Sequence, residues 1–206
     1  MLSCLYLLLA ASLIAAGVLL WRLRLSVSQD VRKTAAFCLW LGAYACTVNM
    51  PILSSVIEPE VAILGTNLNL YVSFPMMALV MLDLTHGWQW QRATWGRIFL
   101  ALAAMFELMR RAEAGTDYGQ FVLTACTFAL LYAIFRIIKN ARSTDQALSK
   151  YCIVLGFYFG LMIASLWSFN TSLALLWNGL TLLTFGGYLY FSASTIALAS
   201  PLLSPK

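Results

Sequence analysis

Residues 97–111 read RIFLALAAMFELMRR and form the shortest and most charged of seven apolar runs in the chain. Three runs precede it and three follow it, so the side assigned to everything downstream depends on whether this run crosses a membrane. Between Arg97 and Arg110 there is room for about 18 Å of helix, which is short for a hydrocarbon layer of about 30 Å. Extending the helix to Gly115 gives about 27 Å, and arginine side chains can reach outward to the headgroups. We therefore predict a short crossing helix here.

The composition indicates an all-α integral membrane protein. Hydrophobic residues make up 62% of the 206-residue chain and charged residues 10%, with a mean hydropathy of +0.82. A soluble domain carries roughly 25% charged residues to cover its surface. A chain with so few must place most of its surface against a lipid bilayer, and we expect a multi-pass protein of a plasma membrane or bacterial inner membrane.

We expect one domain of seven transmembrane helices covering residues 1–206. The approximate spans are 2–20, 34–56, 61–84, 97–114, 119–138, 151–167 and 172–193. No basic residue precedes the first run, and Arg22 and Arg24 follow it. This order predicts an uncleaved anchor with its N-terminus outside, whereas cleavage near Gly17 is the alternative.

The basic residues test this topology. With seven crossings, only Arg110 and Arg111 of the 13 basic residues face outside. The other 11 face inside: Arg22, Arg24, Arg32, Lys33, Arg92, Arg97, Arg136, Lys139, Arg142, Lys150 and Lys206. If residues 97–114 did not cross, the split would become 8 to 5. Because short cytoplasmic loops carry an excess of Lys and Arg, the pattern predicts an outside N-terminus and an inside C-terminus.

An internal repeat is suggested by a shift of 114 positions. It places Leu9, Ala11, Ala15 and Arg22 on Leu123, Ala125, Ala129 and Arg136, and the phrase C-x-x-L-G-x-Y at Cys38 recurs at Cys152. The corresponding plan is a 3+1+3 parallel repeat. In size and topology alone this layout resembles the sugar-facilitator and cargo-receptor group, although the Pro-Gln dipeptide of that group is absent. Chance similarity between apolar segments is the alternative.

Several function classes are disfavoured. The basic residues lie singly or in pairs, so they form no patch for nucleic acid. His86 is the single histidine, which excludes a haem held by paired histidines. No Lys lies in the seventh run for a retinal Schiff base. We find neither a metal-ligand set nor a nucleophile–base pair, so we predict no cofactor, no metal and no enzymatic activity.

Polar residues inside apolar runs are candidates for function because they are costly there. Asn69 and Asn178 lie at similar depth from the outer ends of the third and seventh runs. Across a central cavity their amides can bind a small neutral solute, with Trp177 offering an apolar surface. The alternative is that each asparagine bonds a neighbouring helix, a contact worth about 0.6 kcal/mol on average.

Two charged groups need separate interpretations. Glu107 with Arg110 and Arg111 is either a proton or anion site or a self-paired helix end, because these positions are one turn apart. Asp83 and His86 also lie one turn apart, at the inner side of the membrane. They are either a pair that binds a proton or a metal or a solvated pair at the interface. The tryptophans between Thr85 and Arg97 are typical of a headgroup-level aromatic belt.

The leading hypothesis is a small membrane protein that facilitates transport of, or binds, a small neutral or weakly polar solute. The alternative is an accessory or sensory subunit that acts through other membrane subunits. A homo-oligomer is compatible with either.

Overall fold

The computed structural model describes residues 2–22, 28–53, 55–86, 88 and 90–112. It also describes helical residues 121, 122, 125, 126, 128, 129, 131–133, 135, 136 and 139. Within these residues every regular element is a helix. The prediction of an all-helical protein is therefore confirmed for this part of the chain. The expected runs 151–167 and 172–193 lie outside the described residues.

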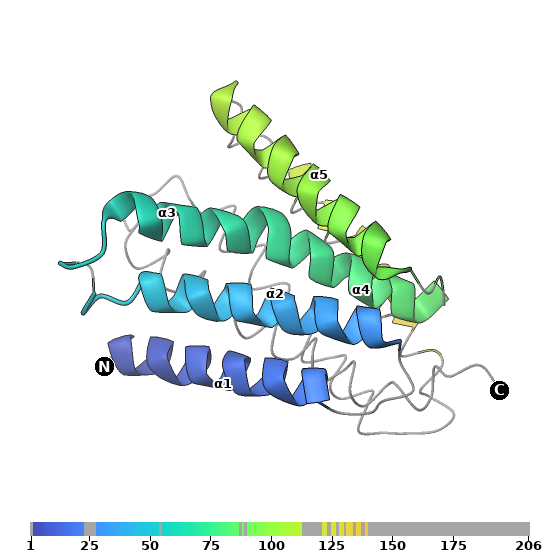
Figure 1. Cartoon of the computed structure of the whole chain (residues 1–206), viewed down its shortest axis with the longest axis horizontal. Coiled ribbons are helices and arrows are strands. Elements are labelled where there is room, and N and C mark those ends of the chain that lie inside the picture. The colour runs from blue at the N-terminus through green and yellow to red at the C-terminus, as the bar shows by residue number, and fades with distance from the viewer. Residues whose placement is uncertain are drawn as a thin grey trace.

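The first two helices form an antiparallel pair (Figure 1). Helix α1 spans Leu2–Arg22 and α2 spans Gln29–Val48. The pair is close because small residues face the contact: Gly17 lies directly against the ring of Trp40, and Ala10, Ala36 and Ala43 are buried. Small residues at a contact allow two helix backbones to approach each other closely.

Helix α2 differs at both ends from the expected run 34–56. It begins earlier because Ser28 acts as N-cap and its hydroxyl accepts the backbone N–H of Val31 at 3.4 Å. It ends earlier because Asn49 closes the helix, with its backbone N–H donating to the Ala45 and Thr47 carbonyls. Pro51 follows within two residues and cannot continue the helical hydrogen bonds.

The next helix runs back along α2 and is continuous over 28 residues, Pro59–His86. It consists of α3 (Pro59–Leu68), a π-helical turn η1 (Asn69–Ser73) and α4 (Phe74–His86). Within η1 the Phe74 N–H donates to the Asn69 carbonyl, five residues back. Pro75 lies just after the turn, and because it has no N–H to donate, it accounts for the local departure from α-helical bonding.

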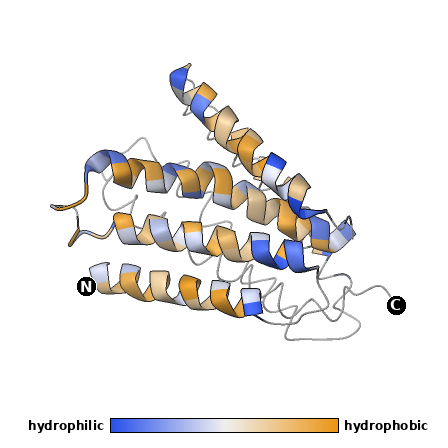
Figure 2. Ribbon diagram, in the orientation of Figure 1, coloured by the Kyte–Doolittle hydropathy of each residue, from blue (hydrophilic) through white to orange (hydrophobic). Residues whose placement is uncertain are grey.

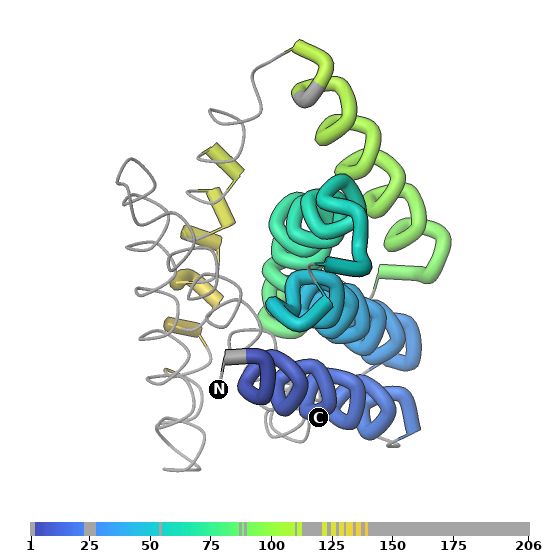
Figure 3. The backbone as a smooth tube through the Cα atoms, turned by 90° about the vertical axis from the view of Figure 1, so that its left-hand side faces the viewer, coloured from blue at the N-terminus to red at the C-terminus, as the bar shows by residue number. Residues whose placement is uncertain are grey.

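Helix α5 spans Arg92–Arg111 and is longer at its start than the run predicted from Arg97. The expected connector Thr85–Arg97 is therefore wrong in extent, since α4 reaches His86 and α5 begins at Arg92. The 20 residues of α5 give about 30 Å of helix. In Figure 1, α5 is inclined to the other helices, and the end at Arg111 projects beyond them. Figure 3 shows α5 on the far side of α3 and α4 from α1.

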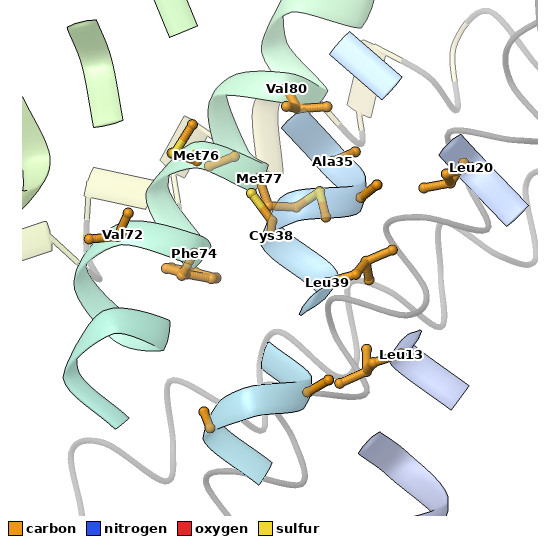
Figure 4. Close-up of a cluster of buried hydrophobic side chains, with 14 of the residues drawn as sticks. Leu13, Leu20, Ala35, Cys38, Leu39, Val72, Phe74, Met76, Met77 and Val80 are labelled. Atoms are coloured by element: carbon orange, nitrogen blue, oxygen red, sulfur yellow. The ribbon is translucent and has the colours of Figure 1, made fainter. Parts of the chain in front are cut away.

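The core lies between α1, α2 and the η1–α4 segment. Figure 4 shows Leu13 and Leu20 of α1 facing α2, and Met76, Met77 and Val80 on the segment that packs against its other side. Cys38 and Leu39 of α2 are fully buried between them. The flexible methionines fill the irregular space beside the π turn.

Two described helices are long and apolar enough to cross a bilayer, namely Ser3–Arg22 and Pro59–His86. They correspond to the first and third expected spans. Figure 2 shows hydrophobic residues along both, whereas polar residues gather at one end of the bundle, where α1 and α4 end and α2 and α5 begin. Helix α5 is not one of these two apolar helices, and charged residues lie near both of its ends.

Candidate functional site

A polar seam connects α2 to the helix that follows it. Asn49 Nδ2 donates to the Ala45 carbonyl at 2.9 Å and, across the hairpin, to the Ala62 carbonyl at 3.3 Å and Thr66 Oγ1 at 3.1 Å. Two turns further along, Ser73 Oγ donates to the Cys38 carbonyl at 2.9 Å inside the core. These contacts hold the two helices in register while satisfying their polar groups.

Asn69 lies within the same seam, but its side-chain oxygen has no hydrogen-bond donor among the described residues. Its side chain is 2% exposed, and its Oδ1 accepts no hydrogen bond from any residue that the structure describes. Leaving a buried acceptor without a donor costs about 1–3 kcal/mol. Within the described residues no neighbouring helix donates to Asn69 Oδ1, whereas Asn49 bonds across to the next helix. The two interpretations of Asn69 both stay predictions.

The backbone around Asn69 is also irregular. Asn69 is the first residue of the π turn, and its carbonyl accepts the backbone N–H of Phe74, five residues on. Single π turns occur often at functional sites. On the outer side of the turn, the Tyr71 and Phe106 rings stack with centroids 4.7 Å apart, which joins η1 to α5. The turn thus contacts α2 on one side and α5 on the other. Within it, Asn69 Oδ1 accepts no hydrogen bond from the described residues.

The structure does not connect the other predicted site residues to Asn69. Asn178 and Trp177 lie outside the described residues. Glu107 Oε1 accepts from Arg111 Nε at 2.9 Å, one turn along α5, and the Arg111 side chain is 77% exposed while that of Glu107 is 41% exposed. A pair this exposed contributes little to stability. The Arg110 side chain lies outside the described residues, so the proton or anion site and the self-paired helix end both stay predictions.

A column of aromatic rings extends across the end of the bundle. Successive ring centroids are 5.5 Å apart from Tyr132 to His86, 4.7 Å from His86 to Trp88, 5.1 Å from Trp88 to Trp90 and 5.3 Å from Trp90 to Trp95. The His86 ring also lies within hydrogen-bond distance of Thr85 and Tyr132. The sequence predicts only a belt for these tryptophans. The column is not visible in it, because Tyr132 lies 46 residues from His86.

Among the surface grooves lined by described residues are two that Asn69 does not line. One, of about 410 Å³, lies between α1 and α2 and is lined by Ile14, Val18, Trp40, Ala43, Tyr44 and Thr47. The other, of about 320 Å³, opens at the polar end of the bundle. Its lining residues are Trp21, Asp30, Lys33, Thr34, Phe37, Met76, Arg92, Trp95, Gly96 and Phe99.

Comparison with known proteins finds no matching family model, no similar curated protein and no similar solved structure.

Proposed function

We propose that the chain is a seven-helix membrane protein, N-terminus outside and C-terminus inside, that binds or passes a small neutral or weakly polar solute at Asn69. The observation that carries the solute site is the buried Asn69 Oδ1, which accepts no hydrogen bond from the described residues. A solute hydroxyl or amide N–H supplies the missing donor.

Exposed apolar side chains support the membrane placement. Leu7 and Leu8 on α1 are 60% and 65% exposed, and Leu100 on α5 is 66% exposed. In the fifth run the exposed phenylalanines recur every seven residues, at Phe121, Phe128 and Phe135. In water such surfaces favour association, whereas against lipid chains they need no cover.

The π turn supports an opening at Asn69. Asn69 lines neither of the two grooves described above, and we propose that a movement of the helix opens a way to it. A π turn beside a proline is a place where a helix bends. We therefore propose that α3 and α4 hinge at η1, with the Tyr71–Phe106 stack as the contact that α5 must release.

The experiment uses the full chain reconstituted into liposomes, with swelling rates measured for a graded series of polyols, urea and sugars. We expect at least one solute to enter faster than it enters empty liposomes, and Asn69→Leu to abolish that gain. Because Leu has nearly the shape of Asn and removes an unsatisfied acceptor, the variant should fold as well as the parent.

Ser73→Ala is the matched control, one turn away on the same seam. It loses the hydrogen bond to the Cys38 carbonyl but leaves Asn69 intact, so it should lower stability slightly and retain flux. Flux equal to empty liposomes for every solute, or unchanged in Asn69→Leu, contradicts the proposal.

The accessory-subunit alternative is supported by the apolar outer face of α5, where Leu100, Met105 and Leu108 are exposed. A partner helix can cover such a face as well as lipid can. Purification from native membranes in mild detergent separates the two proposals. A stoichiometric partner chain favours the subunit, and a particle of this chain alone favours solute binding.

A further inference from the structure

The groove at the polar end of the bundle combines an apolar wall with a charged rim. Phe37 of α2, Met76 of α4 and Phe99 of α5 form the wall. At the rim are the cations Lys33 and Arg92 and one carboxylate, Asp30. Asp30 Oδ2 is engaged by the backbone N–H of Arg92 at 2.9 Å, so the two cations outnumber one already bonded anion. This distribution suits a ligand with an anionic head and an apolar tail.

A second feature of the groove is an unused donor. Trp95 is 2% exposed and lines the groove, and its Nε1 donates no hydrogen bond to any residue in the described part of the chain. A buried indole N–H ordinarily finds an acceptor. A phosphate or ester oxygen bound in the groove provides one once the Trp95 N–H turns toward it.

The third feature is open space on α5. A Cβ built on Gly96 has no heavy atom within 4 Å, although Gly96 lines the groove. The contrast with Gly17 and Gly65, where a Cβ meets Trp40 and Val48, shows that this glycine is not required for helix packing. The absent side chain leaves the groove accessible between the rim and the wall.

We propose that this groove binds one anionic phospholipid, with its phosphate between Lys33 and Arg92 and an acyl chain along Phe37, Met76 and Phe99. The neighbouring elements agree with that role. Lys33 Nζ lies 5.0 Å from the centre of the Trp21 ring, and the aromatic column from Tyr132 to Trp95 continues the rim. Tryptophan beside Lys and Arg is characteristic of the headgroup level. The site is independent of the proposed solute pathway, because Asn69 does not line it.

The test measures binding of a tail-labelled phosphatidylglycerol to the purified full chain in detergent, beside phosphatidylcholine with the same label and acyl chains. Each cation near an anionic headgroup changes affinity about fivefold. We expect phosphatidylglycerol to bind the more tightly of the two, and Lys33→Gln and Arg92→Gln each to lose about fivefold of that preference. Both are rim positions, so these variants keep the fold.

Gly96→Leu blocks the groove and should remove binding of either lipid. Ala101→Leu, an exposed position on α5 outside the groove, is its matched control and should bind as the parent does. Equal binding of the two lipids, or unchanged binding in Gly96→Leu, overturns the proposal. Displacement of the labelled lipid by millimolar inorganic phosphate also overturns it, because the site then recognises a free anion and not a lipid.

Discussion

The carboxylate of Asp30 accepts the backbone N–H of Arg92 at 2.9 Å, across 62 residues of sequence. Asp30 lies in the first turn of α2, and Arg92 is the first residue of α5. The side chain therefore satisfies one of the donors that a helix start leaves without an intrahelical partner, from a different helix. It also places an anion at the positive ends of two helices at once.

Asp30→Ala should destabilise the protein by about 1 kcal/mol, as loss of a helix cap ordinarily does. The loss should be concentrated in the first turn of α5, since the Arg92 N–H then has no acceptor there. Hydrogen–deuterium exchange should rise at residues 92–95, while Gln29→Ala, the preceding residue, leaves it unchanged. Equal exchange in both variants contradicts a capping role for Asp30.

The two glycines Gly17 and Gly96 should respond in opposite directions to alanine. At Gly17 a Cβ would lie 2.8 Å from Trp40 Cδ1, and Trp40 is held by stacking on Trp21 at 5.5 Å. Gly17→Ala should therefore cost about 1–3 kcal/mol by overpacking. Gly96→Ala meets open space and should raise stability by about 0.5–1 kcal/mol through helix propensity. Unfolding in mixed detergent measures both, and a loss of stability in Gly96→Ala would contradict the open space assigned there.

Asn49→Ala should loosen the connection between α2 and α3. The substitution removes the two bonds to Ala62 and Thr66 across the hairpin. At about 0.6 kcal/mol for each interhelical bond, the expected loss is about 1 kcal/mol. The same detergent unfolding measures it, with Asn67→Ala as the control, an asparagine on α3 that is also partly buried. A loss no larger than that of the control indicates that Asn49 does not hold the hairpin.

The helices whose position depends on apolar length alone were predictable. The runs 2–20 and 61–84 correspond closely to Leu2–Arg22 and Pro59–His86, because long uncharged stretches leave few alternatives. The starts of α2 and α5 were each placed five residues late. One start depends on the Ser28 cap, which is local, and the other on Asp30, which no local pattern associates with Arg92.

The candidate site was predictable only as a residue type. Asn69 is a candidate because an amide within an apolar run is costly. The sequence does not show that it begins a π turn or that no described residue donates to its Oδ1. The groove had no sequence signal, because its lining comes from four helices. Gly96 within it lies in the tryptophan-rich segment before residue 97, where the sequence gives no reason to single it out.

The proposed seven-helix arrangement requires α5 to cross the bilayer. The decisive measurement is labelling of single cysteines at Gln91 and Ala112 with a membrane-impermeant maleimide, in a background where the native cysteines are replaced and the fold is retained. Both positions lie just beyond the ends of α5. We predict that Ala112→Cys is labelled from outside and that Gln91→Cys is labelled only after the membrane is opened. Labelling of both from the same side contradicts the crossing and the seven-helix arrangement with it.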